Sequence, residues 1–278
     1  MRDALVGIAV AMLAATPAMS ADLPVKAPPI VAVYNWTGFY VGGNVGYTWG
    51  RSDYGLSYPS NGAAPPDFSV AFPTIQAAPA IAGTGRLNPD GVIGGLQAGY
   101  NRQFGRFVAG IEVDVSASGL RKTSILNTTF PAGLGNVFSG QPLNVTTSIK
   151  NDWLATVRPR FGVAFDRTLA YVTGGVAVGG VSYFQSNNWL SNIPTNVTDV
   201  GAVSQTKWGW TVGAGLAHAF NDKWSVRGEY LYTDLGSVSV VTQTLVGGPA
   251  FPPANTFTHT ANLTTNTLRF GVDYKIAP

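Results

Sequence analysis

The chain has 278 residues and a formal net charge of only +3, with charged residues at 11% and aromatic residues at 12%. So little charge, combined with 34 glycines, is unlike a soluble enzyme of this length and favours a sheet protein whose outer surface faces lipid. No basic cluster indicates nucleic-acid binding, and the absence of cysteine excludes thiol catalysis and cysteine-ligated metals.

The beginning of the chain has the organisation of a secretory signal peptide. Arg2 supplies the basic region, Ala4–Ala15 is the apolar segment, and Ala18–Ala21 offers small residues for cleavage. A membrane-spanning helix is the alternative, but the apolar run is too short and Pro17 ends it. We therefore predict that residues 1–21 direct export and are removed.

A short linker separates this segment from the rest of the chain. Residues 22–35 include Pro24, Pro28 and Pro29, which indicates an extended segment that we expect in the periplasm. Residues 36–278 are predicted to form a single domain.

Beyond the linker, apolar and polar residues alternate with period 2, which predicts strands with two different faces. In the last strand, Phe270, Val272 and Tyr274 share one face, while Arg269 and Asp273 share the other. The predicted strands are, in chain order, residues 36–49, 92–104, 107–116, 152–165, 169–183, 207–220, 224–232 and 263–276. Apolar aromatic residues on one face and charges of both signs on the other indicate lipid outside and a polar interior.

The connections between these strands alternate in length. The short ones are residues 105–106, 166–168 and 221–223, and the long ones are residues 50–91, 117–151, 184–206 and 233–262. The long segments are rich in Pro, Gly, Asn, Ser and Thr, as surface loops are. Short turns at one end and long loops at the other favour an all-β, eight-stranded antiparallel up-and-down transmembrane β-barrel in the outer membrane over a soluble sandwich.

Tryptophans gather near the strand ends, where two membrane interfaces would lie. Trp36 and Trp224 are at short-turn ends, whereas Trp49, Trp153, Trp208 and Trp210 are toward long-loop ends. We predict that these six side chains belong to two aromatic girdles. The alternative is an ordinary sandwich core, which would not leave charge on the opposite face of each strand.

The charged faces predict a network of ionic side chains inside the barrel. Continuing each alternation places Glu112, Asp114, Arg158, Arg160, Arg227, Glu229, Arg269, Asp273 and Lys275 inward. Eight tilted strands enclose a space that side chains just fill, and an unpaired buried charge is costly. The network is therefore predicted to plug the barrel, with a narrow ion path as the alternative.

Histidine is scarce, which limits the chemistry open to the chain. His218 is expected on the lipid-facing side, and His259 in the last long loop near Thr258 and Thr260. A histidine general base needs an orienting partner, and none is evident, so we predict no catalytic residues. No phosphate-binding loop or metal-ligand cluster occurs, and we predict neither a cofactor nor a metal.

Four segments together resemble a known family: WTGFYVGGNVGYTWG, GWTVGAGLAHAF, WSVRGEYLYTDLG and LRFGVDYKI. They are similar to the small outer-membrane β-barrel proteins of alphaproteobacteria, described as outer-membrane immunogenic or porin-like proteins and related in fold to OmpA-type barrels. The resemblance implies insertion by the barrel assembly machinery. One departure is Ile276, because such barrels usually end on an aromatic residue, and Ala277 and Pro278 follow it.

These features predict a structural and surface-interactive protein that maintains the envelope, contacts lipopolysaccharide, and recognises host or other partners through its loops. Aromatic residues are prominent in those loops: Phe68, Phe72, Phe130, Phe138, Trp189, Phe251 and Phe257. A small porin of low conductance is the alternative, and a lipid-modifying enzyme is the third possibility.

Overall fold

A computed structural model describes residues 34–57, 84–129, 132, 139–189, 197–246 and 256–277. All of them belong to one compact unit, Val33–Pro278. The predicted signal peptide, most of the linker, and the loop residues Phe68, Phe72, Phe130, Phe138 and Phe251 lie outside the described residues. Within the part of the chain that is described, there is no helix long and apolar enough to cross a membrane.

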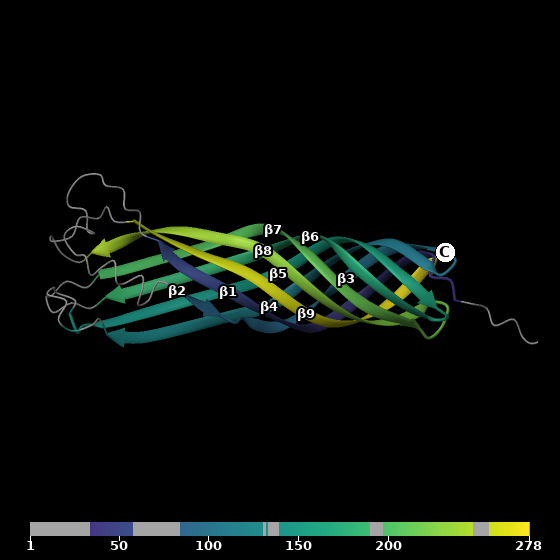
Figure 1. Cartoon of the computed structure of the whole chain (residues 1–278), viewed down its shortest axis with the longest axis horizontal. Helices are drawn as coiled ribbons and strands as arrows, with labels where there is room; N and C mark the ends of the chain where they lie inside the picture. The colour runs from purple at the N-terminus through teal and green to yellow at the C-terminus, as the bar shows by residue number, and fades with distance from the viewer. Residues whose placement is uncertain are drawn as a thin grey trace, which may run out of the picture. The chain divides into compact units, whose positions relative to one another are not determined.

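The described chain folds into antiparallel strands that close into a ring (Figure 1). The strands are β1 Gly38–Ser57, β2 Thr84–Leu87, β3 Asp90–Phe104, β4 Phe107–Thr129, β5 Pro142–Phe165, β6 Thr168–Trp189, β7 Val197–Ala219, β8 Trp224–Val246 and β9 Thr256–Ala277. The paired strands follow one another in the order β1, β3, β4, β5, β6, β7, β8 and β9, and β9 pairs with β1 to complete the ring. The four-residue β2 pairs with β1 alone and lies two residues before β3, so eight strands form the wall. The predicted all-β barrel is confirmed.

Two connections are tight turns whose backbone conformation suits their residues. Gly105 has φ +60° and Asp166 has φ +55°, in turns that join β3 to β4 and β5 to β6. Glycine adopts a left-handed conformation without steric cost, and aspartate tolerates it better than most residues do. We call this side of the barrel the short-turn end and the other side the long-connection end.

The strands run obliquely around the ring, as Figure 1 shows, and the register measures this tilt. One row of paired residues runs from Val41 through Ala98, Val113, Val157, Val176, Trp210, Asp234 and Thr264 to Arg51. The row starts at Val41 and returns to β1 at Arg51, ten residues nearer the long-connection end. Each step to the next strand therefore climbs by a little more than one residue, as the tilt of a closed barrel requires.

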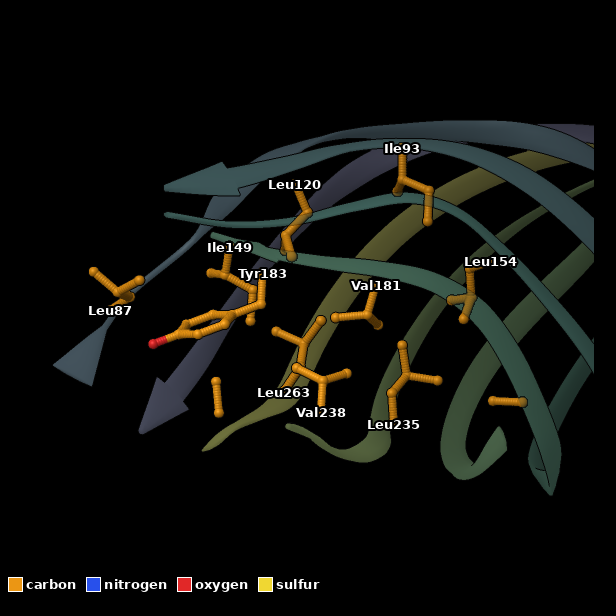
Figure 2. Close-up of a cluster of buried hydrophobic side chains, with 12 residues drawn as sticks. Leu87, Ile93, Leu120, Ile149, Leu154, Val181, Tyr183, Leu235, Val238 and Leu263 are labelled. Carbon is orange, nitrogen blue, oxygen red and sulfur yellow. The ribbon is translucent and has the colours of Figure 1, made fainter. Parts of the chain in front are cut away.

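The strands are much longer than the sequence analysis predicted. Six of them, β1, β4, β5, β7, β8 and β9, continue by more than six residues into segments that were expected to be loops, so the predicted loop boundaries were wrong. Toward the long-connection end, apolar side chains point inward beside polar ones such as Thr147 and Gln185. The buried apolar members are Leu87, Ile93, Leu120, Ile149, Leu154, Ala177, Val181, Tyr183, Leu235, Val238, Ala261 and Leu263, which we call the inner cluster. Figure 2 shows these side chains converging on the space that the strands enclose.

In two strands, β5 and β8, an irregularity in the ladder changes which residues face inward. The β5–β6 register shifts between Asn151 and Trp153, and the β8–β9 register shifts between Asp234 and Ser237, next to Gly236 with φ +68°. A bulge adds one residue to a strand and so exchanges the faces of all residues beyond it. Period-2 alternation read through such a point assigns the wrong face, which is why the extensions of β5 and β8 were not recognised.

Candidate functional site

The interior of the barrel holds three layers of side chains. At the short-turn end lies an apolar group that we call the mouth cluster: Tyr34, Trp36, Val108, Ala164, Leu169, Tyr171, Ala217 and Ala219. A layer of charged residues follows, and the inner cluster occupies the long-connection end. Every layer is built from buried side chains.

Eight of the nine predicted interior charges lie together in the middle layer. Glu112, Asp114, Arg158, Arg160, Arg227, Glu229, Arg269 and Asp273 are all buried. Four arginines face four carboxylates, so the formal charges cancel. We call this set the charge network.

Arg158 and Arg269 connect strands on opposite sides of the ring. Arg158 Nη2 donates to Glu112 Oε1 at 2.6 Å and to Asp114 Oδ2 at 3.0 Å, and its Nη1 lies 3.3 Å from Glu229 Oε2. Arg269 Nε donates to Glu229 Oε2 at 2.8 Å, and its Nη1 donates to Asp114 Oδ1 at 3.0 Å. Because these contacts join β4, β5, β8 and β9, the side chains bridge the interior.

Arg227 and Arg160 complete the network from other strands. Arg227 donates to Glu112, and its Nε lies 3.5 Å from Asp273 Oδ2. Arg160 is 3.7 Å from Glu112 Oε2, and its guanidinium stacks 3.5 Å from the ring centroid of Tyr171. An arginine over an aromatic face gains from the cation–π attraction, which compensates here for a long ion pair.

Uncharged polar residues also hold the carboxylates, and the sequence analysis did not single them out. Tyr40 donates to Glu112 Oε2 at 2.6 Å, Tyr171 donates to Glu229 Oε1 at 3.1 Å, and Gln97 Nε2 donates to Asp273 Oδ1 at 2.8 Å. These residues occupy inward positions of β1, β6 and β3. The same alternation that identified the charges could have found them, because polar residues on the inward face were the signal.

Lys275 does not join the charge network, so its predicted place there was wrong. It lies near the end of β9, below the network, half-buried at the short-turn end. Its Nζ donates to the backbone carbonyl of Asn35 at 2.6 Å and lies 5.3 Å from the ring centroid of Tyr34.

Trp36 was predicted in an aromatic girdle, and this prediction was wrong. Its side chain is only 6% exposed and packs within the mouth cluster, at 4.9 Å and edge-on to Tyr34. Its backbone N–H donates to Gln103 Oε1 at 2.8 Å. Trp36 precedes β1, so the strand alternation does not govern its direction, and the chain folds over the mouth of the barrel there.

The other five predicted girdle tryptophans face outward, with exposures from 37% for Trp153 to 71% for Trp208. The cross-strand partners of Trp153, followed from strand to strand, lead to Val45 on β1 after three strand-to-strand steps. Those of Trp208 lead to Gly43 on β1 after five steps. Each step rises by a little more than one residue along the barrel axis, so the three steps add about four residues and the five steps about six. Both tryptophans therefore lie level with Trp49. These three and Trp210 form what we call the upper girdle.

Trp224 lies at the other end of the outward apolar band. Its cross-strand partners are Tyr274 on β9 and then Val41 on β1. These two steps rise by about two to three residues, so Trp224 lies level with Phe39 and not with Val41. Ten residues of tilted strand separate that level from Trp49, which is roughly 25 Å along the barrel axis. This height equals the apolar band of an outer-membrane barrel.

The two histidines lie in different surroundings. His259 is fully buried in β9, so its predicted place in a surface loop was wrong. His218 is exposed on the outward face of β7, with its Nδ1 2.9 Å from Thr168 Oγ1. No group of three or more potential metal ligands occurs among the residues that the structure describes.

Charged residues reappear on the outward face above the upper girdle. Arg51 Nε and Arg86 Nε each donate to Asp53 at 2.8 Å. Asp53 is exposed to water beyond the apolar band. The hydrogen bond from Arg51 lowers the pKa of its carboxyl most, and the hydrogen bond from Arg86 lowers it further.

Comparisons with known proteins agree with this architecture. The sequence model of a family described as "Outer membrane protein beta-barrel domain" matches residues 6–275. The "31 kDa outer-membrane immunogenic protein" of Brucella melitensis biotype 1 is 31% identical over 275 residues, which cover 96% of each chain. The "22 kDa outer membrane protein" of Rhizobium leguminosarum bv. viciae is 27% identical over 209 residues, covering 75% of this chain and 69% of that protein.

Solved structures that match this chain include the outer membrane protein OprG from Pseudomonas aeruginosa. It covers 87% of this chain and 98% of its own, with a TM-score of 0.39 and 12% identity. Neisserial surface protein A covers 86% of this chain and 98% of its own, with a TM-score of 0.32 and 12% identity.

Proposed function

Because the chain belongs to the family of outer membrane protein β-barrel domains, we propose that it is a closed barrel that acts through its surface and not through transport. The observation that carries this proposal is the interior, where the mouth cluster, the charge network and the inner cluster follow one another. An eight-stranded barrel encloses only enough space for side chains, and here three layers occupy it.

The proposed orientation puts the long-connection end at the cell surface and the short-turn end in the periplasm. The strand extensions then raise the long connections above the membrane, where the barrel keeps the apolar side chains of the inner cluster from water. Binding functions concentrate in loops that a rigid scaffold presents, so we propose that these connections recognise host or other partners. Lipopolysaccharide is the proposed lipid neighbour on this side, and the barrel assembly machinery the partner during insertion.

We propose no catalytic activity for this barrel. The two relatives described above are named as outer-membrane or immunogenic proteins and not for a reaction. His259, the residue considered for a lipid-modifying reaction at the surface, is buried in β9 and offers no solvent-facing base.

The test is single-channel conductance of protein purified from outer membranes and inserted into planar bilayers. A closed barrel produces no stable current steps, while a shift in gel mobility on heating shows that the sample was folded. Reproducible steps from such folded protein would overturn the proposal and favour the small-porin alternative.

A further inference from the structure

Two basic residues face each other on the outward surface near the long-connection end. Arg121 on β4 pairs directly with Lys150 on β5, and both are exposed. The Cβ atoms of directly opposite residues in an antiparallel pair are about 5 Å apart, and like charges at that separation repel. The pair gains stability when an anion lies between the two side chains.

The register places this pair just above the upper girdle. Arg121 pairs with Asp90, and Asp90 pairs with Trp49, so two steps separate Arg121 from the level of Trp49. Because each strand-to-strand step rises by a little more than one residue, Arg121 lies about two to three residues above the level of Trp49 and Lys150 about four. These distances are roughly 6–10 Å along the barrel axis. The polar headgroup layer, about 5–8 Å thick in each leaflet, lies at this depth.

The two nearby carboxylates have partners other than Arg121. Asp90 accepts the hydroxyl of Tyr47, and Asp152 lies 3.5 Å from Lys150 Nζ in an exposed ion pair. Within the described ranges, Arg121 forms no ion pair, so its planar set of N–H donors is available to an anion of the headgroup layer.

We propose that Arg121 and Lys150 bind a phosphate group of the glycolipid in the outer leaflet. This inference rests on the proposed orientation, because it requires the long-connection end to face the cell surface. An arginine binds phosphate through two parallel N–H groups, and a lysine adds a compact positive charge beside it. The exposed ring of Trp153, below Lys150 on β5, contacts the sugar or the upper part of an acyl chain.

The experiment measures binding of diphosphorylated lipid A to the detergent-purified protein by native mass spectrometry. Arg121→Gln and Lys150→Gln should each raise the apparent Kd at least about tenfold, because each removes a charge-assisted contact. Arg102→Gln is the matched control, since Arg102 is an exposed arginine at the short-turn end, 5.1 Å from the ring centroid of Phe104. It should bind lipid A as the wild type does.

Two further probes identify the ligand. Dephosphorylated lipid A should bind the wild type as weakly as diphosphorylated lipid A binds the Arg121→Gln variant, and inorganic phosphate at the same concentration should not compete. Equal binding of the dephosphorylated lipid, competition by free phosphate, or unchanged affinity of both variants would each overturn the proposal.

The orientation is tested separately, so that the two failures are distinguishable. A membrane-impermeant thiol reagent should label a Lys122→Cys variant on intact cells, because Lys122 is exposed near the same end. Absence of labelling would reject the orientation, whereas labelling together with unchanged lipid affinity would reject the phosphate site alone.

Discussion

Arg158 and Glu112 are direct cross-strand partners of β5 and β4, joined by a 2.6 Å hydrogen bond between two fully buried side chains. Their contact is one member of a network that reaches Glu229 on the far wall. The barrel is therefore held together across its interior as well as around its circumference.

The charge network should make a large contribution to stability. Glu229→Ala removes one of the carboxylates that Arg269 and Arg158 share, and breaking a buried pair by removing one partner costs about 3–5 kcal/mol. The measurement is the urea unfolding midpoint in detergent, followed by the heat-dependent gel shift.

Asp222→Asn is the control for that substitution. Asp222 is 89% exposed and pairs with Arg167 at 3.6 Å, so its loss should change the free energy of unfolding by less than about 1 kcal/mol. Similar midpoints for Glu229→Ala and the wild type would show hydrated charges and would support a water-filled channel.

The strand extension should depend on its apolar interior. Leu263→Ala empties a fully buried position of the inner cluster and should destabilise the protein by about 2–5 kcal/mol. Leu268→Ala, on the outward face of the same strand, should cost less because Leu268 is 44% exposed. Limited proteolysis should cut the long-connection end faster in Leu263→Ala alone. Equal cleavage rates for the two variants would contradict an ordered core in this region.

Trp36 should act as a core residue and not as an interfacial one. Trp36→Ala removes the largest side chain of the mouth cluster and should cost about 3–5 kcal/mol in unfolding free energy. Trp224→Ala, on the outward face at the same end, should cost less. Planar-bilayer recordings of Trp36→Ala should remain silent, since the inner cluster still fills the other end. Current steps in this variant would show that the mouth cluster alone closes the barrel.

The carboxyl of Asp53 should titrate below its ordinary range. Hydrogen bonds from Arg51 and Arg86 favour the charged form, so the stabilisation that they provide is present above the unfolded-state pKa of about 3.9. It is lost as the pH falls through the lower folded-state pKa. An NMR titration of the carboxyl carbon in detergent micelles should show this depressed midpoint, and Arg86→Gln should move it upward. An unchanged midpoint in that variant would mean that Arg86 does not bind Asp53 in solution.

Much of the barrel follows from alternation alone. Phe270 and Val272 face outward while Arg269 and Asp273 face inward, because successive residues of a strand point to opposite sides of the sheet. That local rule determined the strand type, the lipid-facing band and the inward direction of eight charged residues. It holds within a strand whatever the rest of the fold does.

Other features depended on contacts between distant segments, and only the tertiary structure decided them. Bulges at Asp152 and Gly236 exchange the faces of β5 and β8, so alternation loses its phase where the inner cluster begins. Trp36 lies outside any strand, and its burial depends on the mouth that residues from β4, β5, β6 and β7 create. The sequence by itself determined which side of each regular strand faces lipid, because that choice is local. The closing of the interior at both ends was decided by packing among residues that meet only when the ring is complete.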